Sequence, residues 1–205
     1  MTTVPAAGRR SPRKDAVRNQ GKLLDAAGEV LRTEPSNATM PLIAAKADLA
    51  TATAYRYYST LDELLSAYLH RVIASLRDFS HDCPATRTAL FEAVATQWLT
   101  LLKTYGTAMI QLRARDGFLE RLHGRDGVIT TVRDAWERPV RSVMREFDVP
   151  DDEFEYALFL FNLMFDPREL LDLERVGFSD EEIIRRQTRS YYAALKALAP
   201  DQDET

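Results

Sequence analysis

The sequence has little of what stabilises secreted proteins or anchors a chain in a membrane. Cys83 is the single cysteine among 205 residues, which excludes an internal disulfide and a cysteine-based zinc site. No apolar run approaches the length that spans a bilayer. The N-terminus carries basic residues without a following apolar stretch, so we expect no secretory signal. Together these absences favour a cytoplasmic protein.

Recognisable catalytic patterns are also missing. No Ser-His-Asp order, glycine-rich phosphate loop or helical pair of histidines stands out. His81, Asp82 and Cys83 stand together and suit a metal or catalytic interpretation. However, no second cluster lies at ligand spacing, and a loop at a helix boundary is the simpler interpretation. We therefore expect no enzyme activity, no metal and no cofactor.

Charge is unevenly distributed along the chain. Residues 1–60 contain nine Lys and Arg against five Asp and Glu, a balance of +4. The remaining residues contain eighteen against twenty-six, a balance of −8, so the net charge of −4 hides a basic first part. This asymmetry predicts that the first part meets a polyanion, with residues 1–14 as a flexible basic arm. A solvated tail without a partner is the alternative.

The hydrophobic pattern is helical throughout. No segment alternates like a strand and no internal repeat is visible, whereas apolar residues recur at three- and four-residue steps. This pattern predicts an all-α protein, with an N-terminal three-helix bundle and a larger C-terminal helical domain. Gly106 is expected to end one helix and Pro139 to kink another. The expected helices cover residues 15–32, 61–80, 86–105, 107–115, 118–123, 126–147, 151–165 and 179–198, with two short helices between 39 and 58 and a further turn at 168–174.

The stretch from Thr39 to Leu65 organises the N-terminal part. Thr39 can cap a short helix, residues 48–50 disfavour its continuation, and Thr51 can cap a second short helix. The expected buried side of the second helix consists of Ala54, Tyr55 and Tyr58. Two short helices joined by a tight turn form a helix-turn-helix, which presents its second helix to the major groove of DNA.

This stretch resembles the DNA-binding domain of the TetR family of transcriptional regulators. The resemblance rests on Leu23 to Ala27, Ile43-Ala44, Ala47, Thr53 to Tyr58 and Asp62 to Leu65, within about Asn19 to Ala67. Three positions depart from the family pattern, which usually has Gly, Ser and Lys where this chain has Asp48, Ala50 and Leu61. Leu61 replaces a lysine that contacts a DNA phosphate in the family.

The resemblance and the residue types together predict three kinds of site. Arginine can bond guanine edges, threonine a base or a thymine methyl, and tyrosine or lysine a phosphate. The predicted DNA-binding residues are Arg13, Lys14, Thr39, Lys46, Thr51, Ala52, Thr53, Tyr55, Arg56 and Tyr57. The resemblance further implies a homodimer that binds a pseudo-palindromic DNA operator, acts as a repressor, and is controlled by a small apolar or amphipathic ligand.

Aromatic and methionine residues of the C-terminal part suit an apolar ligand pocket. The predicted ligand-binding residues are Trp98, Tyr105, Met109, Phe118, His123, Trp136, Val140 and Met144. Ordinary core packing is the alternative for each of them, and a loop histidine for His123. The resulting organisation is a basic arm at 1–14, a DNA-binding domain at 15–60, and a ligand-binding and dimerisation domain at 61–205.

The helix expected at 151–165 is apolar nearly all round and must be covered on more than one side. With the last helix it can form a four-helix bundle across a two-fold axis. The predicted dimer residues are Phe154, Leu158, Phe161, Phe165, Ile184, Tyr191, Leu195 and Leu198. A monomer with a central core helix is the alternative. A second candidate function is a helical ligand- or partner-binding protein that has lost DNA binding, which Ala50 and Leu61 support.

Overall fold

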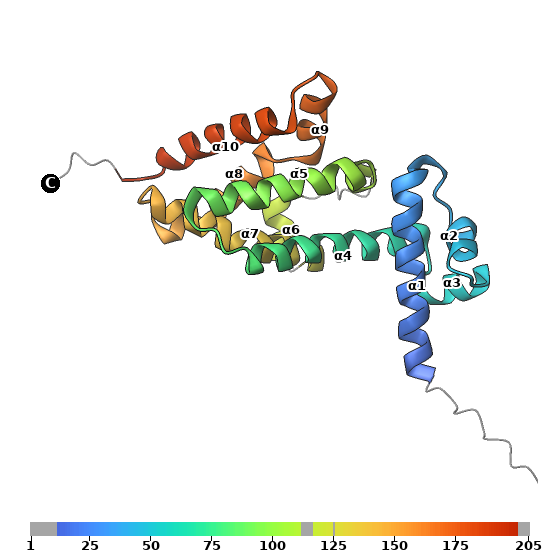
Figure 1. Ribbon diagram of the computed structural model, residues 1–205. Coiled ribbons are helices and arrows are strands. Elements are labelled where there is room, and N and C mark those ends of the chain that lie inside the picture. The colour runs from blue at the N-terminus through green and yellow to red at the C-terminus, as the bar shows by residue number, and fades with distance from the viewer. Residues whose placement is uncertain (1–11, 112–116, 125, 201–205) are drawn as a thin grey trace, which may run out of the picture. The chain divides into compact units, whose positions relative to one another are not determined.

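The computed structural model describes residues 12–111, 117–124 and 126–200, which form helices and no strand (Figure 1). The all-α prediction is therefore confirmed. The elements are α1 (Pro12–Thr33), η1 (Pro35–Asn37), α2 (Met40–Lys46), α3 (Thr51–Tyr57), α4 (Leu61–Asp82), α5 (Arg87–Gln111), α6 (Phe118–His123), α7 (Gly127–Glu146), η2 (Asp151–Glu153), α8 (Phe154–Met164), α9 (Pro167–Arg175) and α10 (Asp180–Lys196).

The chain divides into two compact units, Met1–Tyr68 and Leu69–Thr205. The division falls inside α4, which contributes its first two turns to the smaller unit. The sequence places the boundary after residue 60, at the beginning of α4, whereas the structure divides after Tyr68. A regular helix has no break at which a boundary could be recognised from local sequence signals.

In the smaller unit α2 packs against α1 and α3. The apolar stripe of α1 supplies Leu23, Ala27 and Val30, which are fully buried with Ile43 of α2. Gly28 lies on the same side, and a Cβ atom there would come within 2.6 Å of the Tyr68 ring. Glycine therefore lets the first turns of α4 approach α1 closely.

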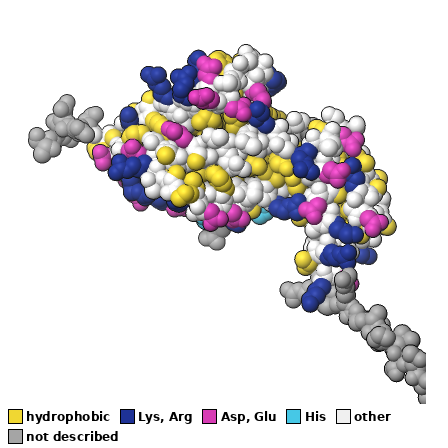
Figure 2. Space-filling model, in the orientation of Figure 1, with side chains coloured by type: hydrophobic (Ala, Val, Ile, Leu, Met, Phe, Trp, Pro, Cys, Tyr) yellow, Lys and Arg dark blue, Asp and Glu magenta, His cyan; other side chains and the backbone are white. Residues whose placement is uncertain are grey.

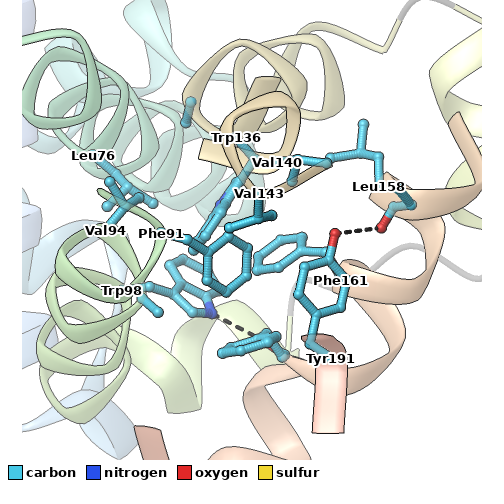
Figure 3. Packing of buried hydrophobic residues seen from close by; sticks show 14 of the residues in the cluster. Leu76, Phe91, Val94, Trp98, Trp136, Val140, Val143, Leu158, Phe161 and Tyr191 are labelled. Carbon is cyan, nitrogen blue, oxygen red and sulfur yellow. Dashed lines mark hydrogen bonds between the residues drawn. The ribbon is translucent and has the colours of Figure 1, made fainter. Parts of the chain in front are cut away.

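The larger unit is built around α5, which packs against α7, α9 and α10. Its centre is an aromatic cluster: the Phe91 ring stacks on Tyr191 with centroids 4.9 Å apart, and Trp136 lies 3.8 Å from Phe161 (Figure 3). The polar atoms of two buried rings are satisfied. Trp98 Nε1 donates to the Phe165 carbonyl at 3.1 Å, and the Tyr191 hydroxyl donates to the Ala157 carbonyl at 2.9 Å (Figure 3). Large aromatic rings with satisfied polar tips stabilise a core of this kind.

Two helix predictions were wrong in the larger unit. Gly106 does not end a helix, since α5 continues to Gln111. A Cβ atom at Gly106 would lie 2.5 Å from Cδ1 of Leu171, so glycine here permits the close approach of α9. The turn expected at 168–174 is a full helix, α9, whose N-terminal amide at Arg168 is capped by the Asp166 side chain at 2.9 Å.

The end of α4 is bonded to α7 through one side chain. The Arg138 guanidinium donates to the carbonyls of Ser80 at 2.5 Å and Cys83 at 2.9 Å, and more weakly to those of His81 and Ala85 at 3.3 Å. The last carbonyls of a helix have no partner within it. Arg138 of α7 therefore supplies donors to carbonyls at and just beyond the end of α4.

Candidate nucleic-acid interface

The two short helices of the smaller unit have the connection that a helix-turn-helix requires. The Thr39 hydroxyl accepts from the Leu42 amide at 3.3 Å and so caps α2, as the sequence predicts. After α2 the chain turns at Asp48, whose φ of 55° is left-handed. Aspartate tolerates this conformation better than most residues do, so it fits this turn.

The cap expected at Thr51 is not formed. Thr51 is the first residue of α3, and the N-cap is Ala50, which has no side chain to accept an amide hydrogen bond. A threonine one position later lies inside the helix and cannot serve as the cap. The Ala50 carbonyl accepts from the Thr53 amide at 2.8 Å, so α3 starts with a backbone hydrogen bond and no side-chain cap.

The orientation of α3 separates its buried and exposed side chains. Ala54 and Tyr58 are buried, whereas Tyr55 is 49% exposed, so the expectation that Tyr55 anchors the helix was wrong. Tyr58 is the tyrosine that packs inside. Ala52 and Arg56 are exposed with Tyr55, and half-buried side chains flank them at Thr51, Thr53 and Tyr57. The exposed face thus contains the residue types that contact base edges and phosphates.

Tyr57 is positioned by two neighbours. The Asn19 amide nitrogen of α1 donates to the Tyr57 hydroxyl at 3.4 Å. The Arg56 guanidinium carbon lies 5.5 Å from the centroid of the Tyr57 ring, within the range of a cation–π contact. No local sequence signal predicts the Asn19 contact, because the two residues are 38 positions apart.

Lys46 is engaged within the protein. Its Nζ lies 2.7 Å from Oε1 of Glu29 on α1. This hydrogen bond raises the pKa of Lys46 and lowers the pKa of Glu29, because each group stabilises the charge of the other. Both side chains are on the surface, so the pair can exchange for a phosphate contact at small cost.

The first helix begins earlier than predicted. Residues 12–14 already belong to α1, so Lys14 lies on a helix, with its side chain exposed. The Arg13 side chain and residues 1–11 lie outside the described part. Arg18, one turn after Lys14, is exposed and was not among the predicted residues. Figure 2 shows Lys and Arg side chains gathered along the N-terminal half of α1.

The predicted ligand-binding residues differ in how far they are buried. Trp98, Trp136, Val140 and Met144 belong to the buried hydrophobic core. Tyr105, Met109 and Phe118 are half-buried. His123 is an exposed residue whose Nε2 lies 3.1 Å from Glu155. The large cleft that the structure shows in this unit is lined by other residues.

The predicted dimer residues face inward. All except Leu198, which is half-buried, are buried within a single chain. Their burial therefore needs no second copy, and the apolar pattern that suggested an interface belongs to the core.

Comparison with known proteins supports the fold. No family model and no curated protein matches the sequence. A solved structure of a candidate transcriptional regulator from Pseudomonas aeruginosa PAO1 is similar, with a TM-score of 0.57, 14% identity, and coverage of 92% of this chain and 93% of that one. The described chain has this regulator's fold. At such low identity the similarity concerns the fold, and function has to be argued from the site.

Two further structures are similar at lower scores. One is a candidate TetR-family regulator from Mesorhizobium loti MAFF303099, with a TM-score of 0.49, 15% identity, and coverage of 89% of this chain and 96% of that one. The other is AmtR from Mycobacterium smegmatis, with a TM-score of 0.44, 17% identity, and coverage of 95% of each chain.

Within residues 12–111, 117–124 and 126–200, no group of three or more potential ligands could hold a metal ion. Over the same residues, no helix has the length and apolar character needed to cross a bilayer.

Proposed function

We propose that this protein is a DNA-binding transcriptional regulator of the TetR type, which acts as a homodimeric repressor under the control of a small molecule. The observation that carries the proposal is the orientation of α3. Ala54 and Tyr58 anchor it in the smaller unit, while Ala52, Tyr55 and Arg56 face solvent. This division is what a recognition helix requires, because its outer face must reach base edges.

The exposed face of α3 suggests how DNA is bound. Arg56 can donate two parallel hydrogen bonds to O6 and N7 of guanine, and Thr53 can contact a thymine methyl. Tyr55 and Tyr57 have hydroxyls suited to phosphates, as do the basic side chains of Lys14 and Arg18 on α1. The base contacts give specificity, and the basic residues give affinity that falls with salt.

A dimer is part of this proposal, because one recognition helix reads only half of a pseudo-palindromic operator. The surface that fits a second copy is the outer face of α8. Tyr156 and Leu163 are 48% and 57% exposed, and Phe159 and Leu160 lie between them at helical spacing. The rings of Tyr156 and Phe159 stack with centroids 5.9 Å apart. Four large apolar side chains on one face are typical of a surface that another protein covers.

Selection of bound sequences from random DNA tests the proposal. The full chain should enrich an inverted repeat whose half-sites lie about one helical turn or a multiple of it apart. Competition with random DNA at a fixed salt concentration then gives the specificity ratio. Enrichment of no sequence, together with equal affinity for all DNA, would remove the regulator proposal.

The second candidate function is a partner-binding helical protein without DNA binding. It is favoured by Ala50, which leaves the N-terminus of α3 without a side-chain cap, and by Leu61 in place of a phosphate-binding lysine. The salt dependence of binding to genomic DNA fragments distinguishes the two. A DNA-binding regulator loses affinity steeply as salt rises, whereas the partner-binding protein shows no DNA affinity at low salt.

A further inference from the structure

The larger unit contains a cleft to which the proposed function has assigned no role. It has a volume of about 580 Å³ and lies between the beginning of α5 and the C-terminal half of α7. Its lining consists of Thr86, Arg87, Leu90, Arg138, Ser142, Arg145 and Glu146. The volume is in the range that small-molecule sites occupy.

The lining has an excess of positive charge. Three arginines face one carboxylate, and that carboxylate is already engaged, since Glu146 Oε2 accepts from the Thr88 amide at 3.0 Å. Arg138 is occupied by the carbonyls at the end of α4. The side chains of Arg87 and Arg145 are exposed. Their guanidinium groups have no hydrogen-bond or ion-pair partner among the residues that the structure describes. Two guanidinium groups in one concave site therefore remain available to an anion.

Ser142 adds a donor at the wall of the cleft. Its side chain is only 8% exposed, and its Oγ accepts from the Arg87 amide at 2.7 Å. The hydroxyls of Thr130 and Thr131, earlier on α7, donate to carbonyls four residues before them. Ser142 makes no such bond among the described residues, so its hydroxyl proton is free to donate to a ligand.

Arg87 has an unusual backbone. Its φ is 57°, in the left-handed region, where the other described non-glycine residues are Asp48 and Asp148. Aspartate tolerates this region, but a long side chain such as arginine is strained there. Glycine would adopt this backbone conformation without that strain.

We infer that this cleft binds a small dianion, a dicarboxylate or a phosphate monoester. Arg87 and Arg145 bind the negative groups, the Ser142 hydroxyl donates a hydrogen bond, and Leu90 contacts the carbon chain. Arg138 lines the same cleft, so the bound anion also competes for the guanidinium that is bonded to the end of α4. The competition for Arg138 rests on the proposed control by a small molecule, whereas the binding of the anion does not.

Titration calorimetry on the full-length protein tests the inference. The probes are succinate and inorganic phosphate, with sodium chloride at matched ionic strength as the reference. We expect saturable binding of at least one probe, and the probe that binds identifies the carboxylate or the phosphate class. Arg87→Gln combined with Arg145→Gln should weaken binding at least about tenfold, as expected for the loss of two charge-assisted contacts. Arg189→Gln, which removes an exposed arginine of α10 outside the cleft, should leave the affinity unchanged.

Arg87→Gly separates binding from folding. Because glycine fits the left-handed backbone, this variant should melt at the same or a higher temperature and still bind the probe more weakly. Binding of neither probe, or the same affinity in the double variant as in Arg189→Gln, overturns the inference. If the protein bound no DNA, these titrations would still measure anion binding. Failure of the proposed function can therefore be distinguished from failure of this inference.

Discussion

Arg56 is the exposed side chain of α3 that can recognise a base with two hydrogen bonds. Arg56→Ala should weaken specific DNA binding by about 1–3 kcal/mol, because the guanine edge loses both donors. Fluorescence anisotropy with selected and random duplexes measures both affinities. Arg189→Ala is the control, because it removes the same charge from the larger unit. An equal loss on both duplexes would assign Arg56 to phosphate rather than to a base.

A second prediction at the scale of single residues concerns Glu29. Its carboxylate holds Lys46 at 2.7 Å, so part of the basic surface is neutralised within the protein. Glu29→Gln should tighten non-specific DNA binding by about two- to tenfold near 0.1 M salt and steepen the salt dependence, because Lys46 becomes free to bind phosphate. The same substitution at exposed Glu181 of α10 is the control. Affinity that does not rise after Glu29→Gln would show that Lys46 is remote from DNA.

At the scale of the element, Gly106 makes a sharp prediction. An alanine Cβ there would lie 2.5 Å from Cδ1 of Leu171 of α9, so the Leu171 side chain would have to shift. Overpacking costs about 1–3 kcal/mol, and the better helix propensity of alanine returns up to about 1 kcal/mol. Gly106→Ala should therefore lower the free energy of unfolding, measured by denaturant titration.

Gly21→Ala is the matched control, because nothing lies within 4 Å of its added Cβ on α1. It should stabilise the protein by about 0.5–1 kcal/mol through helix propensity alone. If both variants were stabilised, α9 would have to be free to move away from α5.

Local sequence signals settled some elements and could not settle others. Thr39 caps a helix as predicted, because a cap depends on neighbours within three residues. Ser179 likewise lies at the helix start that the sequence predicts. Gly106 resembles a helix stop in the sequence, yet its role is set by Leu171, 65 positions away. The burial of Tyr58 rather than Tyr55 likewise depends on how α3 packs in the smaller unit, which periodicity over seven residues does not determine.

At the scale of the whole molecule, the fold class could be predicted and the surfaces could not. Phe161 and Leu195 were expected at a dimer interface and lie in the core, because a buried stripe has the same composition whether the same chain or a second copy covers it. The cleft at Arg87 was missed for a related reason: Arg87, Arg138 and Arg145 come from two helices and have no shared motif. The helix-turn-helix was found because all of its determinants are close in sequence.

The prediction at the scale of the whole molecule concerns the proposed dimer. Leu163 is exposed on α8, so Leu163→Glu should leave the fold of the single chain intact and disrupt only a surface that a second copy covers. Analytical ultracentrifugation should show a monomer, and operator binding should fall with it. Val176→Glu, which changes an exposed valine just after α9, should remain dimeric. A Leu163→Glu protein that sediments as a dimer would place the interface elsewhere.

The chain has only two tryptophans, Trp98 and Trp136, and both lie buried in the core of the larger unit. Their emission is therefore a probe confined to that unit, whereas circular dichroism reports the helices of both. If the two units unfold together, the denaturation curves from the two methods coincide. If the smaller unit melts first, dichroism falls while the tryptophan emission stays unchanged. The placement of two indole rings thus allows the cooperativity of the chain to be measured without any label.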